Sequence, residues 1–339
     1  MAFNVVLQPS GLQFSATDDV SILKSAEIAG MALPYGCRGG SCGSCKGKLL
    51  TGQLEREDED PFALSEDDRA AGFALLCVAK PRSDVTIEIA EVARLADIVV
   101  KTMPSRITTI ERVAPDVVLV TLKLPAAEAF DFRAGQYIEL MFKDGERRAF
   151  SLANPPHQTG SVQLQIRLAE NSYSTRMFTE VLKERDILRF EGPLGTFQRN
   201  PDSSKPMIMV AGGTGFAPIK SMLDDMAYKG IEREVHLYRG SRDRTGLYLS
   251  QLPEQWTASL PGFKYVPVLS DATPACAWTG RTGFVHQAVL DDFANLSDFE
   301  VYVCGAPVMV DAARRDFAAR GLPPEAFFAD AFTPATTKK

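Results

Sequence analysis

The sequence has no hydrophobic stretch long enough to cross a membrane. No run approaches the 18 consecutive apolar residues that are typical of a membrane-spanning helix. The first residues, MAFNVVLQPSGLQF, lack the basic segment and the long apolar segment of a secretory signal. We therefore expect no membrane association and a cytoplasmic location, a reducing compartment in which structural disulfides are rare.

The chain also has no excess of basic residues. Its 43 acidic and 37 basic residues give a net charge of −6, and residues 1–91 alone hold 14 acidic and 8 basic residues, which accounts for the whole imbalance. An acidic surface repels phosphates, so we expect no nucleic-acid partner. Much of the acidity lies in residues 55–69, EREDEDPFALSEDDR. We interpret this run as a solvated loop and helix face, or as a docking surface for a basic partner.

Cysteine is uncommon, with six copies, yet three of them fall within CRGGSCGSC. Such clustered thiols suit disulfides, a zinc ion or an iron–sulfur cluster. A zinc ribbon brings two C-x2-C pairs, and only one is present here. Cys37, Cys42 and Cys45 instead have the C-x4-C-x2-C spacing of a plant-type 2Fe–2S centre, with Cys77 as a distant fourth thiol. We interpret Cys276 as a free thiol.

Glycines and regular elements around these cysteines agree with a cluster loop. We expect positive φ at four glycines, which would leave backbone N–H groups free for the sulfurs: Gly36, Gly39, Gly40 and Gly43. Residues 3–16 predict a pair of strands, and residues 21–31 predict a short helix before the loop. The sequence therefore predicts a small iron–sulfur domain at the amino terminus.

A second part, from about residue 104, is rich in short β segments. Strands are predicted at residues 105–114, 117–125, 136–142, 147–154, 161–169 and 186–193, which favours a small antiparallel barrel. Alternation in RRAFSLAN puts Arg148 and Phe150 on one face and Ser151 on the other. The only helical pattern here, residues 173–183, begins with hydroxyl residues, and a helix amino terminus attracts anions. Arg148 and this helix start would suit a pyrophosphate, although each alone is common in strands and helix caps.

A third part opens with KPMIMVAGGTGFAPIKSML, an apolar strand, a glycine turn and a helix. This order is typical of a dinucleotide-binding βα unit. Gly213 and Gly215 would let a pyrophosphate approach the backbone, and Pro218 suits a first helical turn. Further βα units follow, and the last puts Cys304 and Gly305 at the carboxyl end of a strand, where ligands bind in parallel sheets.

Several segments carry a resemblance to known families. LPYGCRGGSCGSCKG resembles plant-type ferredoxins, which are β-grasp domains. FRAGQY, RAFSLAN, YST and GPLGTF follow the order seen in FAD enzymes of the ferredoxin–NADP reductase-like superfamily, and VYVCGAPVMV resembles its C-G-x-P-x-M element. The whole chain is similar to the reductase components of multicomponent oxygenases, such as those of phenol hydroxylase, methane monooxygenase and benzoate dioxygenase.

The resemblance implies roles at the cluster and the flavin. The cluster ligands would be Cys37, Cys42, Cys45 and Cys77. Arg148 would contact the FAD pyrophosphate, Phe150 would pack on the isoalloxazine in place of the usual Tyr, and Ser151 would lie near flavin N5. A second phosphate element would comprise Asn171, Ser174 and Thr175, with Asn171 in the left-handed conformation that Gly usually supplies. At the end of the chain, Asp330 and Phe332 match an acid and an aromatic at the flavin.

It also implies the nicotinamide site. Cys304 would lie beside nicotinamide C4. The other residues implied at this cofactor follow the glycine turn and the later loops: Gly212, Gly213, Thr214, Gly215, Pro218, Arg242 and Gly305. Arg239, Arg242 and Arg244 would suit the 2′-phosphate of NADPH, but an arginine in this loop is also common among NADH-using relatives, and we favour NADH over NADPH.

These features predict a multidomain α+β and α/β protein. Residues 1–92 would form a β-grasp 2Fe–2S domain, 93–103 a linker, 104–202 an antiparallel FAD barrel and 203–339 a parallel-sheet NAD(P) domain. The implied activity is an NADH-dependent oxidoreductase that passes electrons through FAD and the cluster to a Rieske or diiron oxygenase. Two alternatives stay open. The same series of electron carriers could serve a CDP-6-deoxyhexulose dehydratase in deoxysugar synthesis, or the protein could be a redox sensor without fast turnover. We expect a monomer.

Overall fold

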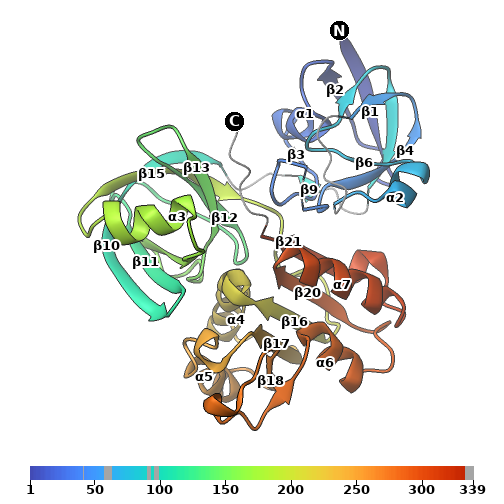
Figure 1. Cartoon of the computed structure of the whole chain (residues 1–339). Coiled ribbons are helices and arrows are strands. Elements are labelled where there is room, and N and C mark those ends of the chain that lie inside the picture. The colour runs from blue at the N-terminus through green and yellow to red at the C-terminus, as the bar shows by residue number, and fades with distance from the viewer. Residues whose placement is uncertain (41, 57–62, 90–92, 95–98, 333–339) are drawn as a thin grey trace. The chain divides into compact units, whose positions relative to one another are not determined.

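The protein divides into two compact units. A computed structural model describes residues 1–40, 42–56, 63–89, 93–94 and 99–332 (Figure 1). The first unit holds Met1–Ile98 with the short segments Gly195–Phe197 and Asp330–Pro334, and the second holds the rest. Within the described part, none of the helices is both long enough and apolar enough to span a bilayer.

The first unit is built on a five-stranded sheet of order β2-β1-β8-β4-β6. Strand β1 is antiparallel to β2 and parallel to β8, so the predicted strand pair at residues 3–16 is confirmed. The predicted helix is α1, whose first turn is capped by the Ser21 hydroxyl. The elements of this sheet and helix are β1 (Ala2–Gln8), β2 (Gln13–Thr17), α1 (Ile22–Ile28), β4 (Lys46–Thr51), β6 (Phe73–Leu75) and β8 (Val85–Glu88).

Shorter elements complete this unit. Strands β3 (Met31–Ala32) and β9 (Ala93–Arg94) pair with each other, as do β5 (Leu54–Glu55) and β7 (Lys80–Pro81). Helix α2 (Glu66–Ala70) begins with a capping box, in which the Ser65 hydroxyl accepts from the Asp68 N–H and the Asp68 carboxylate accepts from the Ser65 N–H. Asp68 also pairs with Lys46 at 2.7 Å.

The second unit begins with a six-stranded antiparallel barrel of order β13-β12-β15-β10-β11-β14. A β-bridge between Leu152 and Leu164 closes it. Its core is a single cluster of buried aliphatic and aromatic side chains that includes Ile107, Leu140 and Phe190. The strands are β10 (Lys101–Ala114), β11 (Val117–Lys123), β12 (Tyr137–Met141), β13 (Arg147–Ser151), β14 (Ser161–Arg167) and β15 (Ile187–Leu194).

The predicted barrel and its single helix are confirmed. The helix consists of α3 (Tyr173–Arg176) and a wider π-helical segment, η1 (Met177–Val181). Because β10 already begins at Lys101, residues 101–103 of the predicted linker belong to a strand. The exact limits proposed for the three domains stay predictions.

The third part is a sheet of order β19-β18-β17-β16-β20-β21, parallel from β19 to β20. Helices α4 and α5 contact each other, α4 also contacts β16 and β20, and α5 contacts β18. Helices α6 and α7 form a second contacting pair (Figure 1). The strands are β16 (Met207–Gly212), β17 (Val235–Ser241), β18 (Phe263–Leu269), β19 (Arg281–Thr282), β20 (Glu300–Gly305) and β21 (Phe327–Ala331). The helices are α4 (Phe216–Lys229), α5 (Leu252–Ser259), α6 (Val285–Asp292) and α7 (Pro307–Ala318).

Short 3-10 turns join these elements. They are η2 (Gly213–Gly215), η3 (Arg244–Gly246), η4 (Pro274–Cys276) and η5 (Pro324–Ala326). The first of them connects β16 to α4 and forms the predicted glycine turn. The parallel-sheet class predicted for this part is therefore confirmed.

A buried ion pair makes the parallel-sheet domain sensitive to one substitution. Arg233 donates to Glu300 at 2.5 Å, both side chains are about 5% exposed or less, and Glu300 also accepts from the Tyr302 hydroxyl at 2.8 Å. Removing one member of such a pair leaves a buried charge. We expect Arg233→Met to lower the free energy of unfolding by about 3–5 kcal/mol.

Both tryptophans, Trp256 and Trp278, lie in this domain, so their fluorescence during urea unfolding measures its stability. Lys264→Met is the matched control, because Lys264 and its partner Glu234 are both largely exposed and the pair contributes at most about 1 kcal/mol. Equal unfolding midpoints for the two variants would contradict the expected role of the buried pair.

Candidate functional site

Four thiols of the first unit come together, as the cysteine spacing predicts. Cys42, Cys45 and Cys77 are buried and Cys37 is half-buried. The N–H of Cys37 donates to Cys42 Sγ at 3.3 Å, and the N–H of Gly39 donates to Cys37 Sγ at 3.4 Å. Backbone donors therefore point at sulfur, which is the arrangement that tunes an iron–sulfur cluster.

The thiols form two hydrogen-bonded pairs, Cys37 with Cys42 and Cys45 with Cys77. The bond to Cys37, together with burial, raises the pKa of Cys42 well above its ordinary value. The bond to Cys77 and burial do the same to the pKa of Cys45, whereas the pKa of Cys77 is lowered by that bond. Buried thiols of this kind become thiolates when a cationic centre replaces their protons.

This arrangement fits a two-iron cluster, in which each iron takes two of four cysteines. A zinc site would instead gather its ligands around one ion. The site thus offers four soft thiol ligands arranged as two pairs.

The glycines of the cluster loop have two different roles. Gly40 and Gly43 have φ values of 79° and 73°, as expected. Gly36 and Gly39 are not in the left-handed region, which corrects that expectation, and Arg38 is there instead with φ 57°. Gly36 matters for packing, because a Cβ at this position would lie 3.2 Å from Cys42 Sγ.

The predicted terminal acid belongs to the first unit. Asp330 is buried, and its Oδ1 lies 3.1 Å from where a Cβ on Gly36 would be. Burial, and then the nearby Cys37, raise the pKa of Asp330 to about 7. Phe332 is half-buried in the same short segment. Their roles at a flavin stay predictions.

In the second unit, strand β13 presents the predicted flavin motif. Arg148 and Phe150 share a face directed at the helix: the Arg148 guanidinium lies 4.8 Å from the centre of the Tyr173 ring, and Phe150 packs edge-on against Phe178. Arg148 also donates to Glu146 at 2.5 Å, with 14% of its side chain exposed. Ser151 is buried at the end of the strand.

Polar side chains in and around the helix beside this motif hold it in place. The Tyr173 hydroxyl donates to the Asp144 carboxylate at 2.9 Å, and burial together with this bond raises the pKa of Tyr173 to about 12. Asn171 has φ 55°, the left-handed conformation expected of it. The helix cap is Ser172, which the sequence did not single out, and its hydroxyl accepts from the Thr175 N–H at 3.1 Å. Ser174 lies in the first turn of α3.

The glycine turn and the end of β20 lie at one edge of the parallel sheet. Ala211 of β16 pairs with Cys304 of β20, so the carboxyl ends of the two strands are adjacent. Gly213 has φ 55° and open space where a Cβ would point. A Cβ on Gly215 would lie 2.2 Å from the Cys304 carbonyl oxygen, so this glycine permits close packing of the turn against the end of β20.

Neighbouring residues complete this edge. A Cβ on Gly212 would meet Met309 Sδ at 2.7 Å, and one on Gly305 would meet Met309 Cε at 2.7 Å. Thr214 and Pro218 are buried at the start of α4. The Cys304 side chain is fully buried. The polar backbone and the small residues suit a dinucleotide at this edge.

One arginine lies elsewhere than expected. Arg239 is 1% exposed, its guanidinium lies 3.7 Å from the Phe216 ring centre and 4.6 Å from that of Tyr248, and it donates to the Tyr248 carbonyl. This burial corrects the expectation that Arg239 would suit the 2′-phosphate of NADPH. Arg242 and Arg244 are exposed.

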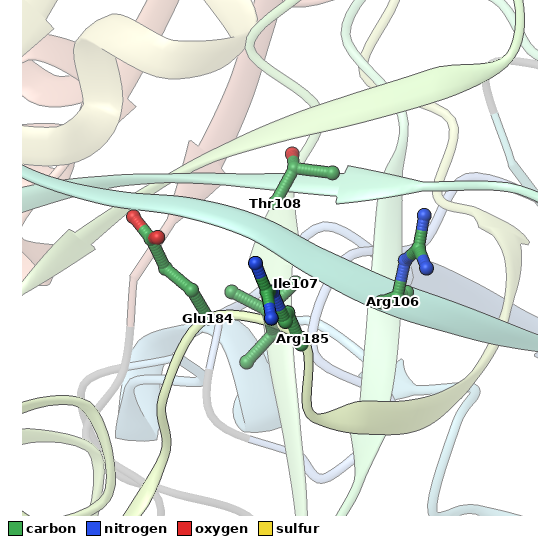
Figure 2. Close-up of a pocket in the computed structure, with 5 residues that line it drawn as sticks. All are labelled: Arg106, Ile107, Thr108, Glu184 and Arg185. Atoms are coloured by element: carbon green, nitrogen blue, oxygen red, sulfur yellow. The ribbon is translucent and has the colours of Figure 1, made fainter.

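A shallow hollow of about 300 Å³ lies elsewhere on the barrel. Figure 2 shows Glu184 and Arg106 at its two sides, with Arg185 and Ile107 between them. Thr108 is its fifth lining residue, and both arginines are exposed. Since no predicted site residue lines this hollow, we assign it no role.

Comparisons with known proteins match the three parts in order. Family models match residues 5–82 as a 2Fe-2S iron-sulfur cluster binding domain, residues 104–199 as an oxidoreductase FAD-binding domain and residues 209–315 as an oxidoreductase NAD-binding domain. The cofactors of this chain are therefore a 2Fe–2S cluster, FAD and a nicotinamide dinucleotide.

Relatives match over nearly the whole chain. The CDP-6-deoxy-L-threo-D-glycero-4-hexulose-3-dehydrase reductase of Yersinia pseudotuberculosis is 40% identical, covering 99% of this chain and 100% of its own. Reductase component 1 of terephthalate 1,2-dioxygenase from Comamonas sp. is 36% identical, covering 99% of each. The crystal structure of an Amycolatopsis cytochrome P450 reductase aligns with a TM-score of 0.79 and 31% identity, covering 98% of this chain and 100% of that one.

The three matched domains together form an electron-transfer chain. A nicotinamide domain, a flavin domain and a one-electron cluster occur in one polypeptide, and relatives with the same full-length organisation are reductases. The protein is accordingly an oxidoreductase that belongs to the ferredoxin–NADP reductase-like family, in the branch that carries an amino-terminal 2Fe–2S domain.

Proposed function

We propose that this reductase takes electrons from NADH and delivers them, through FAD and the cluster, to a partner oxygenase of the Rieske or diiron class. The observation that supports this acceptor is the 36% identity, over 99% of both chains, to a terephthalate dioxygenase reductase component. Nicotinamide gives two electrons together, whereas a 2Fe–2S centre takes one. Bound FAD supplies the chemistry that joins the two, because it accepts a pair and releases single electrons.

The flavin-side residues have distinct proposed roles. Arg148 binds the FAD pyrophosphate, Phe150 covers the isoalloxazine, and Ser151 contacts its reactive edge. The second phosphate contact comes from the helix start, through Asn171, Ser174 and Thr175. The adjacent Tyr173 holds the Arg148 guanidinium over its ring and so orients this cation.

The proposed nicotinamide site lies at the edge formed by β16 and β20. The open side of Gly213 admits the pyrophosphate, with Gly212, Thr214, Gly215 and Pro218 shaping the turn. Cys304 and Gly305 form the wall beside the nicotinamide ring. Arg242 lies at the adenosine ribose, and Asp330 and Phe332 act at the flavin. Cys37, Cys42, Cys45 and Cys77 ligate the cluster. We propose a monomer for the free protein.

Adjacent arginines provide a test of the flavin site. Arg148 turns toward the helix, whereas Arg147 pairs on the other face with Glu139 and Glu191, each at 2.7 Å. Losing a hydrogen bond to a charged group costs about 1.5–3 kcal/mol, so Arg148→Met should weaken FAD binding about 10- to 100-fold. Flavin fluorescence during titration of FAD-free protein measures this, and Arg147→Met should bind FAD as the wild type does. Equal affinities for the two variants would remove Arg148 from the site.

An anaerobic titration with NADH tests the whole electron path. Optical spectra should show bleaching of the flavin, and EPR should show a rhombic signal of the reduced 2Fe–2S cluster. Bleaching without the EPR signal would break the proposed step from FAD to cluster. A response to NADPH but none to NADH would overturn the proposed cofactor preference and our interpretation of residues 238–248. A slow response, without rapid reduction of cytochrome c, would favour a redox sensor.

A second acceptor is supported by the 40% identity to the Yersinia dehydrase reductase. That acceptor would be a deoxyhexulose dehydratase that uses the same electrons. An assay that supplies each candidate acceptor enzyme with NADH and this reductase distinguishes the two acceptors. Only the matched partner should receive electrons fast enough for its turnover to be limited by its own chemistry. The acidic first turn of α2, with Glu66, Asp67 and Asp68, would favour a basic docking surface and salt-sensitive rates.

A further inference from the structure

The barrel and the glycine turn, both in the second unit, are joined by a buried tyrosine. Tyr248 is 4% exposed, and its hydroxyl lies 2.7 Å from Gln165 Oε1 on β14 and 3.3 Å from the carbonyl oxygen of Gly213. A hydroxyl has one hydrogen and makes one strong donor bond at a time. Exchanging the amide O and N of Gln165 resolves this, because the amide then donates to the hydroxyl and the hydroxyl donates to Gly213.

This exchange also gives a partner to Gln165 Nε2, which is buried without one among the described atoms. Burial raises the pKa of Tyr248, so the hydroxyl keeps its hydrogen. The Tyr248 ring is held from the other side by the guanidinium of Arg239, which also covers the ring of Phe216, the first residue of α4. Tyr248 therefore has little freedom to move without the turn.

Helix α4 itself makes two contacts with the barrel. The ammonium of Lys220 donates to the Ala153 carbonyl at 3.1 Å and pairs with Asp224 at 2.7 Å. The hydroxyl of Ser221, fully buried, donates to the Asn154 carbonyl at 2.7 Å. Both acceptors lie within three residues of Ser151, the end of the flavin motif.

The Asn154 side chain fixes this acceptor segment in turn. Its amide group donates to the carbonyls of Gln158 and Ser161 and accepts from the N–H of Gln163 at 2.8 Å. The residues that follow Ser151 are thus held by the barrel on one side and by α4 on the other. Tyr248 bonds to Gln165 of the barrel and to the turn before α4, while Lys220 and Ser221 of α4 bond to the barrel directly. We refer to these bonds together as the barrel–α4 contact.

We propose that Tyr248, Lys220 and Ser221 are positioning residues that set the distance and angle between the nicotinamide and the flavin, an inference that rests on the proposed function. The barrel–α4 contact connects the turn that binds one cofactor to the strand end that binds the other. Reacting atoms need to approach to about 3–3.5 Å, and a displacement of about 1 Å can slow a reaction about 100-fold. Three buried bonds at the same boundary restrict that displacement.

Tyr248→Phe tests the inference because it removes one oxygen and keeps the ring that packs on Arg239. We expect anaerobic stopped-flow reduction of FAD by NADH to slow about 10- to 100-fold. The long-wavelength charge-transfer absorbance of the nicotinamide–flavin complex should also fall, and backbone hydrogen exchange in residues 207–216 should become faster. The dissociation constant of NADH should change much less than the rate.

Tyr238→Phe is the matched control. Tyr238 is also a buried tyrosine of the same domain, but its hydroxyl bonds to Asp292 of α6, away from the barrel. This variant should match Tyr248→Phe in FAD content and thermal stability, yet keep wild-type rates and charge-transfer absorbance. If both variants behave alike in rate, spectrum and exchange, the inference is wrong.

A second pair guards against a folding defect in Tyr248→Phe. Ser221→Ala removes a bond across the domain boundary, whereas Ser105→Ala removes a buried bond of 3.1 Å inside the barrel. Slower FAD reduction in Ser221→Ala alone supports the inference, and equal rates overturn it. A wild-type protein whose FAD responds to neither NADH nor NADPH would overturn the proposed function itself, which distinguishes that failure from wild-type reduction with unaffected variants.

Discussion

Cys77→Ser should yield a protein that keeps its flavin and loses its cluster. Cys77 is buried and bonds to Cys45, so its thiol lies within the group of four proposed ligands. Serine presents a harder oxygen in place of a soft thiolate, which suits iron–sulfur chemistry poorly. NADH should still bleach the FAD, because no residue of the second unit changes. Iron and sulfide content should fall to background, and the EPR signal of the reduced protein should disappear.

The loss of the cluster should leave the first electron-transfer step intact and stop the last one. Two-electron reduction of FAD should proceed at the wild-type rate, while NADH-dependent transfer to the partner enzyme should fall to the rate without reductase. Cys276→Ser is the matched control, because Cys276 lies in a 3-10 turn of the parallel-sheet domain, where its thiol donates to the Thr273 carbonyl. Full iron content in Cys77→Ser, or loss of iron in Cys276→Ser, would contradict the assignment of the four ligands.

Short-range patterns were sufficient to predict the cluster loop. The C-x4-C-x2-C run lies within nine residues, so its geometry depends on local backbone conformation. The positive φ values of Gly40 and Gly43 follow from the same local demand. Gly36 was misinterpreted because its reason is close packing against Cys42, and sequence alone does not reveal which neighbour will limit the space for a Cβ.

The barrel was predictable for a different reason. Its strands alternate more and less buried residues over part of their length. Strand β10, with Met103, Ser105 and Ile107 buried between exposed residues, shows the period of two clearly. The change from α3 to a π-helical segment was not predictable, because YSTRMFTEVLK reads as one helical pattern. Boundaries between domains are similarly weak signals, and β10 reaches into the predicted linker.

Charged residues in the interior were the main source of error. Arg239 reads as a surface arginine in YRGSRDR, yet it is buried between two aromatic rings. The signal that was available is its place in β17, after the buried residues Val235, Leu237 and Tyr238. Its partners come from α4 and from the loop after β17, and such long-range pairing requires the fold. Lys220 went unnoticed for the same reason.

Gly215→Ala should disable the nicotinamide domain, although the backbone there is ordinary. Gly215 has φ −58°, which any residue adopts, so the cost is steric. An added Cβ would lie 2.2 Å from the Cys304 carbonyl oxygen and 2.7 Å from the Gly305 nitrogen, and neither backbone atom can rotate away. Overpacking costs about 1–3 kcal/mol where side chains can adjust, and we expect at least about 3 kcal/mol here.

The same substitution should impair catalysis, because the atoms that would have to move belong to the edge where the nicotinamide is proposed to bind. We expect reduction of FAD by NADH to slow about 100-fold, with flavin binding unchanged. Gly230→Ala is the matched control: Gly230, which ends α4, has φ 61° and open space, so alanine there adds about 1 kcal/mol of backbone strain without a clash. Tryptophan fluorescence during urea unfolding and stopped-flow reduction separate the two effects. If Gly215→Ala reduces its flavin as fast as Gly230→Ala, the close approach of α4 to Cys304 has no part in placing the nicotinamide.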